Sequence, residues 1–375
     1  MKIDLLRTLI EAHSVPEEEF DELIEQMKKD PVGFIIDEND PEIAKRKNIV
    51  KSIYQLLLSY EKRVVEKPEM NSITFLGVAA GGYAVAQGMR TGGVVLNVGN
   101  KTIHVDPGIS AIRDCRDYVA CGGWIDPVLI DILLVTHNHI DHAGGVEEYT
   151  ELWLPLSKLL KKTIVANETV VNGNPKFGQG PRIDRYKKAR ISTYALHPGE
   201  TLKIEDLTIK ATKAIHVEAF DPVTGETGGN CIGFIVETPF GTIGITGDSE
   251  YYDSMAEECT DVDYLIAYIV QERSRVSSEP ERFKFRKRKM HSQFLGEAGV
   301  ETLLSEVKPK ICFITHYGDQ LATFRNGKMV FKEIPEAIAR RIEKNTGVKT
   351  IASLNGMTFH IENNALSVNW KYFYM

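Results

Sequence analysis

The sequence Thr-His-Asn-His-Ile-Asp-His-Ala-Gly-Gly, residues 136–145, decides how the rest of this chain is interpreted. Three of the ten histidines of the chain fall within this stretch, together with one aspartate. The apolar run Ile-Leu-Leu-Val at 132–135 precedes it and predicts a short buried strand. A buried strand that leads into a loop rich in imidazoles is difficult to explain by packing and indicates a metal site.

The spacing of the polar side chains in this stretch supports the same interpretation. His137 and His139 are two residues apart and would project to the same side of an extended chain, where both can bind one ion. Asp141 and His142 follow, and the glycine pair at the end of the stretch lets the backbone turn towards a neighbouring point. Neutral imidazole and carboxylate groups suit zinc, and also manganese or iron.

This stretch resembles the second sequence motif of the metallo-β-lactamase-fold superfamily. The other four motifs of that superfamily occur in the expected order, as Val105-Asp106-Pro107-Gly108, Ala214-Ile215-His216, Ile245-Thr246-Gly247-Asp248-Ser249 and Phe313-Ile314-Thr315-His316. Together the five motifs span most of residues 71–360. The resemblance implies an α/β fold of four layers, αββα, in which two mixed β-sheets are sandwiched by helices.

The resemblance also implies a centre with two divalent metal ions, for which we expect zinc, with Mn²⁺ or Fe as alternatives. The ligands implied for one ion are His137, His139 and His216. The ligands implied for the other are Asp141, His142 and His316. Asp248 would bridge the two ions, and Asp106 would orient the ligand histidines without binding an ion itself.

Residues 1–68 predict a helical N-terminal extension, and residues 69–375 predict the hydrolase domain. Ser14-Val15-Pro16-Glu17 has the composition of a helix start, and Asp40-Pro41 begins a second helix with one apolar stripe. We interpret these helices as packed on the main domain. A role in docking a partner, such as formation of a homodimer, is the alternative.

Composition limits the classes of protein to which this chain can belong. Its 375 residues carry a net charge of -7, which argues against a globally basic protein that binds nucleic acid. Five cysteines without a Cys-x-x-Cys pair favour reduced thiols. The sequence has no apolar signal-peptide core and no apolar run long enough to cross a bilayer. We therefore expect a cytoplasmic protein that does not associate with membranes.

Several elements are expected around the motifs. Strand patterns at 72–77, 94–98 and 102–105 predict a meander, interrupted by a glycine-bracketed loop at 81–93. In this superfamily the corresponding loop lies beside the metals, so Tyr83, Gln87 and Arg90 become candidate contacts for substrate. Residues 335–344 predict a last helix, and Asn355-Gly356 predicts a hairpin turn between two closing strands.

Two long polar segments are candidates for binding substrate. Residues 173–190 form a basic segment rich in glycine and proline, which indicates a loop that covers the substrate. The run 273–289 is rich in arginine and lysine, and we expect Arg286 and Arg288 in it to contact phosphate groups.

The pair His291-Ser292, 25 residues before His316, resembles the ribonuclease Z branch of the superfamily and its phosphodiesterase relatives. A His-Ser pair at that place reaches the scissile phosphate in those enzymes, which makes His291 a candidate catalytic residue and Ser292 a candidate contact for substrate. One departure weakens the likeness, because Ala267-Tyr268 occupies the place where ribonuclease Z has a His-Glu pair. We therefore relate the chain to that branch without equating it with ribonuclease Z.

The predicted reaction is hydrolysis of a phosphodiester, such as RNA, a nucleotide or a related compound, through a hydroxide that bridges two metal ions. Asp141 would bind one ion and accept a proton, and His291 would stabilise the developing negative charge or protonate the leaving oxygen. A glyoxalase II-like or lactonase-like hydrolase of a thioester or lactone is the alternative, since the metal motifs would serve it equally. A third hypothesis is a regulatory protein in which the metals are structural.

Overall fold

The computed structural model of the chain describes residues 70–154, 161–183, 191–221, 223–224, 226–271, 294–325 and 328–375. The predicted N-terminal helices (1–68), the basic run 273–289 and the pair His291-Ser292 lie outside these residues, so their assignments stay predictions. The statements that follow concern the described residues, which belong to one compact unit of the chain.

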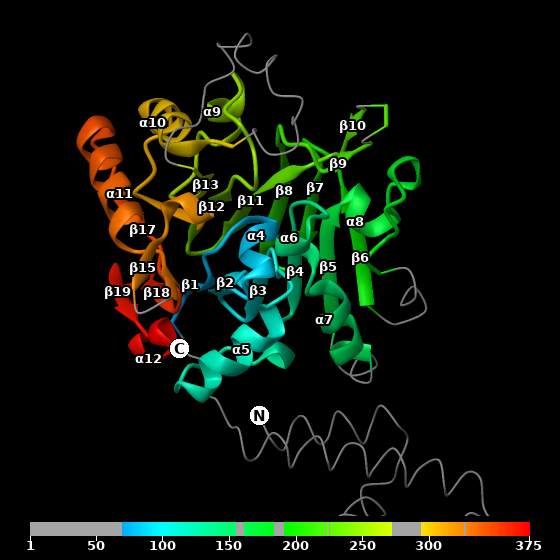
Figure 1. The fold of residues 1–375 in the computed structure, drawn as a ribbon, viewed down its shortest axis with the longest axis horizontal. Helices are drawn as coiled ribbons and strands as arrows, with labels where there is room; N and C mark the ends of the chain where they lie inside the picture. Colours follow the sequence, from blue (N-terminus) through cyan, green and yellow to red (C-terminus); the bar gives the residue numbers. More distant parts are fainter. Residues whose placement is uncertain are drawn as a thin grey trace, which may run out of the picture. The chain divides into compact units, whose positions relative to one another are not determined.

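Two β-sheets form the scaffold (Figure 1). The first sheet has the strand order β19-β18-β1-β2-β3-β4-β5-β6. Its strands are β1 (Ser72–Gly77), β2 (Gly93–Val98), β3 (Lys101–Val105), β4 (Ile132–Val135), β5 (Lys162–Asn167), β6 (Ile191–Leu196), β18 (Met357–His360) and β19 (Ala365–Val368). The second sheet has the order β17-β14-β13-β12-β11-β8-β7. Its strands are β7 (Thr201–Ile204), β8 (Leu207–Lys213), β11 (Ile232–Thr238), β12 (Gly241–Ile245), β13 (Tyr264–Val270), β14 (Ile311–Tyr317) and β17 (Thr350–Ala352).

Helices and two small hairpins complete the described part of the chain. The helices are α4 (Gly81–Ala86), α5 (Ala111–Ala120), α6 (Ile140–Ala143), α7 (Val146–Trp153), α8 (Glu168–Asn172), α9 (Met255–Glu258), α10 (Gly296–Glu306), α11 (Glu333–Thr346) and α12 (Trp370–Tyr374), with 3₁₀ turns at Pro127–Leu129, Pro175–Phe177 and Asp319–Leu321. The hairpins are β9 (Ala219–Phe220) with β10 (Thr227–Gly228), and β15 (Thr323–Arg325) with β16 (Lys328–Val330). None of the helices in the described ranges is long and apolar enough to span a membrane.

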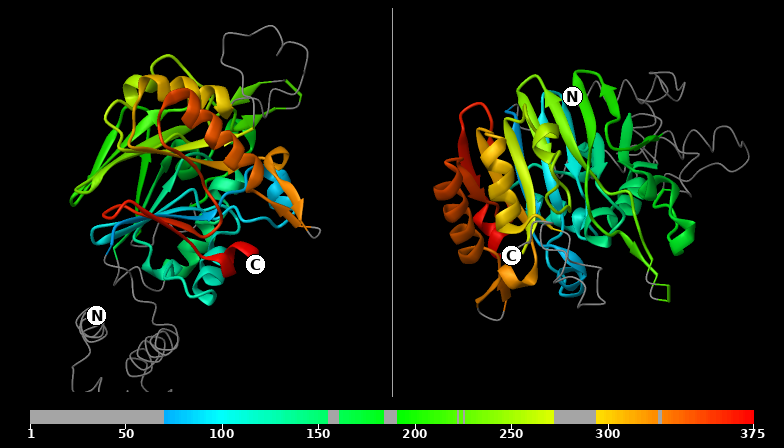
Figure 2. Two further views of the ribbon diagram at one scale, coloured as in Figure 1. Left: turned by 90° about the vertical axis from the view of Figure 1, so that its left-hand side faces the viewer. Right: turned by 90° about the horizontal axis from the view of Figure 1, so that it is seen from above.

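Both sheets are mixed. In the first sheet, β19 through β3 pair antiparallel and β3 through β6 pair parallel. In the second, β7, β8, β11 and β12 pair antiparallel, and β12, β13, β14 and β17 pair parallel. Figure 2 shows the two sheets face to face, with α10 and α11 on the outer side of one and α5 on the outer side of the other. The predicted αββα fold of two mixed sheets between helices is therefore confirmed.

Strand β4 explains why an uninterrupted apolar run precedes the metal motif. Ile132 and Leu134 belong to the large core between the sheets, whereas Leu133 and Val135 belong to a second core beneath α5 and α7. Because successive side chains of a strand point to opposite faces, a strand buried on both faces has no polar positions. The strand is thereby fixed from both sides before it delivers the polar loop.

Main-chain hydrogen bonds join the two sheets at the end where the motifs lie. The N–H of Ile232, at the start of β11, donates to the carbonyl of Thr136, directly after β4 (3.1 Å). At a second point, Tyr317 of β14 donates to the carbonyl of Val78 (2.6 Å) and accepts from the N–H of Ala80 (2.9 Å). These bonds tie β4 and β1 to the second sheet, so residues delivered by different sheets keep a fixed relative position.

Three expectations about local elements need correction. Asn355-Gly356 does not turn a hairpin, because it connects β17 in one sheet to β18 in the other, and β18 forms its hairpin with β19. The Asn355 side chain instead accepts a hydrogen bond from the N–H of Val78 (3.1 Å). The helix predicted at 335–344 is α11, but α12 follows it, so it is not the last. The glycine-bracketed segment 81–93 contains the short helix α4 rather than a continuous loop.

Candidate metal centre

Strand ends of both sheets supply the predicted ligands. The loop and short helix α6 after β4 carry His137, His139, Asp141 and His142. The other three come from the second sheet, where His216 follows β8, Asp248 follows β12 and His316 lies near the end of β14. A rigid scaffold of strands can hold ligands from distant parts of a sequence in one arrangement.

The structure brings these side chains together in two groups whose ligand atoms lie within 4.8 Å of one another. One group is His137, His139, His216 and Asp248, and the other is Asp141, His142 and His316. The three histidines of the first group are called here the first half of the centre, and the second group is called the second half; Asp248, which faces both, is described separately. The two halves contain the same residues as the two ligand sets that the sequence resemblance implies.

Asp248 lies between the two halves. Its Oδ2 is 3.7 Å from Nε2 of His216 and 4.0 Å from Nε2 of His137 in the first half. The same oxygen is 3.4 Å from Nε2 of His142, and its Oδ1 is 3.4 Å from Nε2 of His316, in the second half. A carboxylate that faces both groups is suitably placed to be shared by two ions.

The buried polar atoms of the centre fit a metal site. Nε2 of His142, Nε2 of His316 and Oδ1 of Asp248 are buried and have no hydrogen-bond partner within the described ranges. Buried polar atoms are nearly always hydrogen-bonded, so atoms without a hydrogen bond that converge on one place fit a site where a metal ion can bind them. Nitrogen donors with carboxylates suit zinc and other first-row transition metals. The residues present therefore fit the two divalent ions that the sequence implies.

Hydrogen bonds select which nitrogen of each ring faces the first half. Nε2 of His139 lies 3.1 Å from the main-chain carbonyl of Glu218 and must donate to it, which leaves Nδ1 as the free acceptor. That Nδ1 lies 2.8 Å from Nε2 of His137 and 3.3 Å from Nε2 of His216. Nδ1 of His137 lies 3.1 Å from the Thr136 hydroxyl. These bonds thereby leave Nε2 of His137 and Nδ1 of His139, which lie 2.8 Å apart, for an ion.

Asp106 contacts a ligand histidine of the second half. Its Oδ2 is 3.0 Å from Nδ1 of His142, so this nitrogen carries the proton and Nε2 is left for an ion. Its Oδ1 accepts hydrogen bonds from the N–H of Thr136 (2.8 Å) and from the Thr136 hydroxyl (3.0 Å). Asp106 adopts a positive φ of 48° at the end of β3, a conformation that costs free energy in a residue other than glycine.

The charges of the centre differ between its halves. Burial lowers the pKa of His137 well below its ordinary value and also lowers that of His139. Burial acts to lower the pKa of His142 and His316 too, but the carboxylates, chiefly Asp248, outweigh it and raise both. In the absence of ions, therefore, protonated imidazoles of the second half balance the buried carboxylates.

Asp141 is held in its charged form. Burial acts to raise its pKa, but the positive charges of His142 and His316 outweigh it and lower that pKa below the ordinary range. Its Oδ2 also accepts a hydrogen bond from the N–H of Gly81, at the start of α4 (2.5 Å). A carboxylate with a lowered pKa binds cations readily and takes up protons poorly. Its surroundings thus favour the role of ligand over that of proton acceptor.

The candidate substrate contacts on the segment 81–93 differ in their surroundings. Tyr83, on α4, is 53% exposed and stays a candidate. The Arg90 side chain is 13% exposed and pairs with Asp114 (2.8 Å) and Asp117 (2.9 Å) of α5. Its guanidinium also lies 4.2 Å from the ring centroid of Tyr372. These contacts engage the Arg90 guanidinium within the fold, which argues against the role of substrate contact that the sequence suggested for it.

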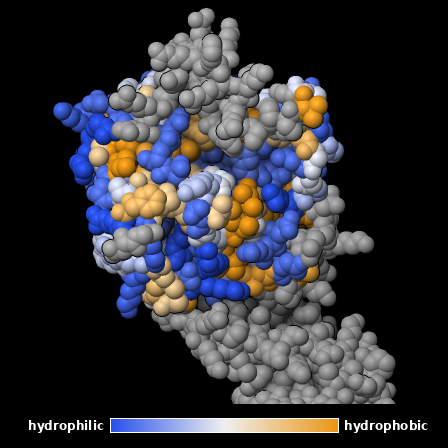
Figure 3. Space-filling model, viewed as in Figure 1, coloured by the Kyte–Doolittle hydropathy of each residue, from blue (hydrophilic) through white to orange (hydrophobic). Residues whose placement is uncertain are grey.

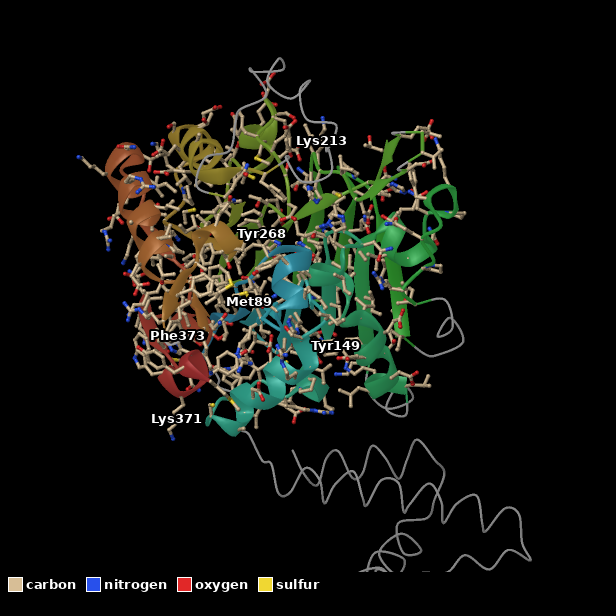
Figure 4. The ribbon with its side chains drawn as sticks, in the orientation of Figure 1. Met89, Tyr149, Lys213, Tyr268, Lys371 and Phe373 are labelled. Atoms are coloured by element: carbon tan, nitrogen blue, oxygen red, sulfur yellow. The ribbon has the colours of Figure 1, made fainter. Side chains whose placement is uncertain are left out.

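Two aromatic residues border the ligand histidines. The ring of Tyr268 stacks on His316 with centroids 4.8 Å apart, and a hydrogen bond to Asp106 contributes to raising the Tyr268 pKa, for which burial is the main cause. Figure 4 shows Tyr268 near the middle of the described part of the chain. The Phe294 ring lies 5.2 Å from that of His216. Tyr268 thus contacts both Asp106 and His316. The sequence comparison showed only that Tyr268 stands where ribonuclease Z has part of a His-Glu pair, and it did not predict these contacts.

Sequence reasoning missed Glu218, which is 3% exposed. Its carboxylate accepts hydrogen bonds from the N–H of Asn138 and from the hydroxyl of Thr169. The signal was present in the spacing His216-Val217-Glu218, since a carboxylate two residues after a predicted ligand can lie on the same side of an extended chain. A single acidic residue in a loop nevertheless has no pattern that distinguishes it from a solvated one.

A family model described as the beta-lactamase superfamily domain matches residues 101–317. An uncharacterized protein of Methanocaldococcus jannaschii is 26% identical over 295 residues, which cover 78% of this chain and 95% of that protein. A protein of Thermoplasma volcanium named as a metal-dependent hydrolase is 30% identical over 125 residues, 33% of this chain and 46% of that protein.

The fold also resembles that of solved structures. The crystal structure of YhfI from Bacillus subtilis, described as a metallo-beta-lactamase fold protein, matches with a TM-score of 0.54 and 16% identity. The match covers 77% of this chain and 98% of that one. At this level of identity the likeness concerns the fold.

Proposed function

The chain belongs to the beta-lactamase superfamily. We propose that it is a hydrolase that uses two divalent metal ions and acts on a phosphodiester. The observation that carries the proposal is the position of Asp248, whose carboxylate faces both halves of a buried centre. The name of the Thermoplasma volcanium relative, a metal-dependent hydrolase, agrees with this assignment.

The residues of the two halves would hold the ions without rearrangement of the fold. His137, His139 and His216 would bind one, Asp141, His142 and His316 would bind the other, and Asp248 would be shared. Bound in this way, divalent ions supply Lewis acidity and lower the pKa of water towards neutrality. Zn²⁺ suits these donors best, with Mn²⁺ or Fe as alternatives.

The protein itself contributes orientation and electrostatics. Asp106 keeps Nε2 of His142 directed at the second half, and the carbonyl of Glu218 keeps Nδ1 of His139 directed at the first. Asp141 is fixed by the N–H of Gly81. Groups that are held before the substrate arrives need no reorganisation during the reaction, which is the main electrostatic advantage of an enzyme over water.

The preference for a phosphodiester rests on His291-Ser292 and on the basic run 273–289. The described part of the chain resumes at Phe294, three residues after His291, and the Phe294 ring lies 5.2 Å from that of His216. Imidazole and hydroxyl groups beside arginine side chains, here Arg286 and Arg288, recognise phosphate. A thioester or lactone requires none of these groups.

Metal analysis and a substrate screen test the proposal. We expect about two equivalents of transition metal per chain by elemental analysis after metal-supplemented expression, and a protein with none would contradict the proposal. The screen should compare a phosphodiester, a cyclic nucleotide, short RNA, single-stranded DNA, a thioester and a lactone. Cleavage of thioesters or lactones together with no action on phosphodiesters would favour the glyoxalase II-like or lactonase-like alternative.

Two variants separate binding of the ions from the reaction. Asp141→Ala should abolish hydrolysis of bis(p-nitrophenyl) phosphate while the circular dichroism spectrum stays that of the folded protein. His291→Ala should lose phosphodiesterase activity and keep both ions. If His291→Ala loses an ion instead, His291 is a ligand and its proposed role in catalysis is wrong.

A further inference from the structure

Asn138 lies between two predicted ligands, His137 and His139, and two charged side chains hold it from different sides. The Glu218 carboxylate accepts a hydrogen bond from the Asn138 main-chain N–H (2.5 Å). The Arg182 guanidinium donates to the side-chain carbonyl (2.5 Å) and to the main-chain carbonyl (3.1 Å) of the same residue. Glu218, Asn138 and Arg182 are called the Asn138 clamp below.

The Glu218 carboxylate is buried and has further partners. Its Oε2 accepts from the Thr169 hydroxyl (2.6 Å), and the Asn167 amide lies 3.3 Å from Oε1 and 3.4 Å from Oε2. Burial of a carboxylate is strongly unfavourable unless its oxygens are hydrogen-bonded, so these donors are required for Glu218 to occupy this place. The donors come from β5, from α8 and from the loop after β4, residues 136–139, which is called the metal loop below. Glu218 therefore fixes these three segments relative to one another.

Glu218 contacts the metal loop at a second point. Its main-chain carbonyl lies 3.1 Å from Nε2 of His139, and this bond decides that Nδ1 of the ring faces the ion. The Gln179 side chain approaches the same carbonyl (3.4 Å). One residue thus fixes the backbone next to His139 and also the orientation of its ring. A ligand histidine whose other nitrogen is fixed binds metal more tightly than a free one.

The neighbouring glycines 228 and 229 approach Glu218 closely. The N–H of Glu218 donates to the carbonyl of Gly228 (3.1 Å), at the end of the hairpin of β9 and β10. A Cβ added at Gly229 would lie 2.3 Å from the Glu218 Cβ, and Gly229 has φ of +136°. Glycine at 229 is therefore required both by its conformation and by the close approach of Glu218.

We propose that Glu218 and Arg182 are positioning residues that set the affinity of the first half of the centre for its ion, without binding that ion themselves. The clamp acts on His137 and His139, whereas the second half depends on Asp106 and Gly81. The inference rests on the proposed function, because it assumes one ion in each half. Its specific content is that the clamp controls one of the two ions.

Variants of Glu218 separate the loss of a hydrogen-bond acceptor from the loss of charge. Glu218→Gln keeps an oxygen that can accept from the Asn138 N–H, while Glu218→Ala removes it. Glu168→Gln is the matched control, since Glu168 precedes Thr169, has a side chain that is 42% exposed and bonds to Asn230 (3.2 Å) away from the metal loop. Arg182→Ala removes the two hydrogen bonds that the guanidinium donates to Asn138, and Arg182 is less buried than Glu218.

The experiment is titration of metal-free protein with Zn²⁺ by calorimetry, with Co²⁺ absorption spectra as a report of ligand geometry and thermal melting of the metal-free form as a test of folding. We expect Glu218→Ala to weaken one of two binding steps by roughly 10–100-fold and to leave the other unchanged. Arg182→Ala should weaken the same step, and Glu218→Gln should restore most of the affinity. Glu168→Gln should match the wild type.

Two results for Glu218→Ala would contradict the proposed role of the clamp. One is a folded variant with both binding steps unchanged, and the other is equal weakening of both steps. If Glu218→Ala does not fold, the same criteria apply to Arg182→Ala. Wild-type protein that binds no metal would overturn the proposed function and the clamp together, which distinguishes that failure from a failure of the clamp alone.

Discussion

The two halves of the metal centre are held by different kinds of partner. In the first half, uncharged groups fix the rings: the Glu218 carbonyl bonds to His139, and the Thr136 hydroxyl lies beside His137. In the second half, a carboxylate and an aromatic ring do so, since Asp106 bonds to His142 and Tyr268 stacks on the neighbouring ligand ring. The rings of the first half therefore contact uncharged groups directly, and the charged side chains of Glu218 and Arg182 bond to the loop between them, whereas in the second half a charged carboxylate bonds to a ligand ring itself.

This difference extends to protonation. In the first half, burial lowers the pKa of His137 and His139, which favours the neutral rings that bind an ion. Carboxylates raise the pKa of His142 and His316 in the second half, so protons must leave when an ion binds there. Two sites built from similar ligands can thus differ in how strongly pH controls the binding of their ions.

The largest effect is expected from Asp248→Ala, because Asp248 faces both halves and its removal tests whether they are coupled. We expect affinity for both ions to fall by more than roughly 100-fold, beyond the range seen for partners that only support a ligand. The measurement is titration of the metal-free variant with Zn²⁺. A variant that loses one ion and keeps the other at full affinity would show that the carboxylate is not shared.

Asp106→Asn should act on the second half alone. Asparagine can still accept a hydrogen bond from Thr136, but it no longer has the charge that fixes the proton on Nδ1 of His142. We expect affinity for one ion to fall roughly 10–100-fold, with the other step unchanged. Together with Glu218→Ala this variant forms a reciprocal pair. If both variants weaken the same step, the division of the centre into two independently supported halves is wrong.

The fold and the ligand groups were implied by a resemblance to a known superfamily, and that resemblance could be found because each of its motifs is a local pattern. The apolar run of β4 and the spacing of His137, His139, Asp141 and His142 all lie within residues 132–142. The supports of the centre were harder to find. Glu218 and Arg182 are single polar residues whose function appears when distant segments meet at Asn138.

Errors in the local predictions have a similar cause. Asn355-Gly356 has the composition of a hairpin turn, but the strands on its two sides belong to different sheets, and local composition does not report strand partners. Arg90 was expected to be a candidate contact for substrate, yet its guanidinium pairs with Asp114 and Asp117 of α5. In each case a contact between segments far apart in the sequence overrides the local pattern.

Figure 3 shows that the surface in the view of Figure 1 is a mixture of hydrophilic and hydrophobic residues. Two apolar residues close to the ligands in the sequence or in space are partly exposed: Ile109 is 41% exposed and Ile140 is 38% exposed, and the N–H of the first donates to the carbonyl of the second (3.1 Å).

His104 is a reference histidine that belongs to neither half. It is fully buried on β3, with Nδ1 2.6 Å from the Tyr149 hydroxyl and Nε2 facing the carbonyl of Gly92, so neither ring nitrogen is free for an ion. Burial lowers its pKa to about 4, against an ordinary value of 6.5. Between these two pH values the unfolded chain binds more protons than the folded one, so stability falls as the pH decreases.

The smallest predicted effect is the change in the free energy of unfolding with pH that is due to His104. This change should not depend on metal, which distinguishes His104 from the ligand histidines. Lowering the pH from 7 to 5 should reduce the free energy of unfolding by about 2 kcal/mol through this residue. In His104→Gln the decline should be smaller by about that amount, as measured by urea denaturation at each pH. Because His104 binds no ion, the difference between wild type and variant should be the same with and without Zn²⁺. A difference that changes when Zn²⁺ is added would show that His104 is coupled to the centre, and the contrast between ligand and structural histidines would fail.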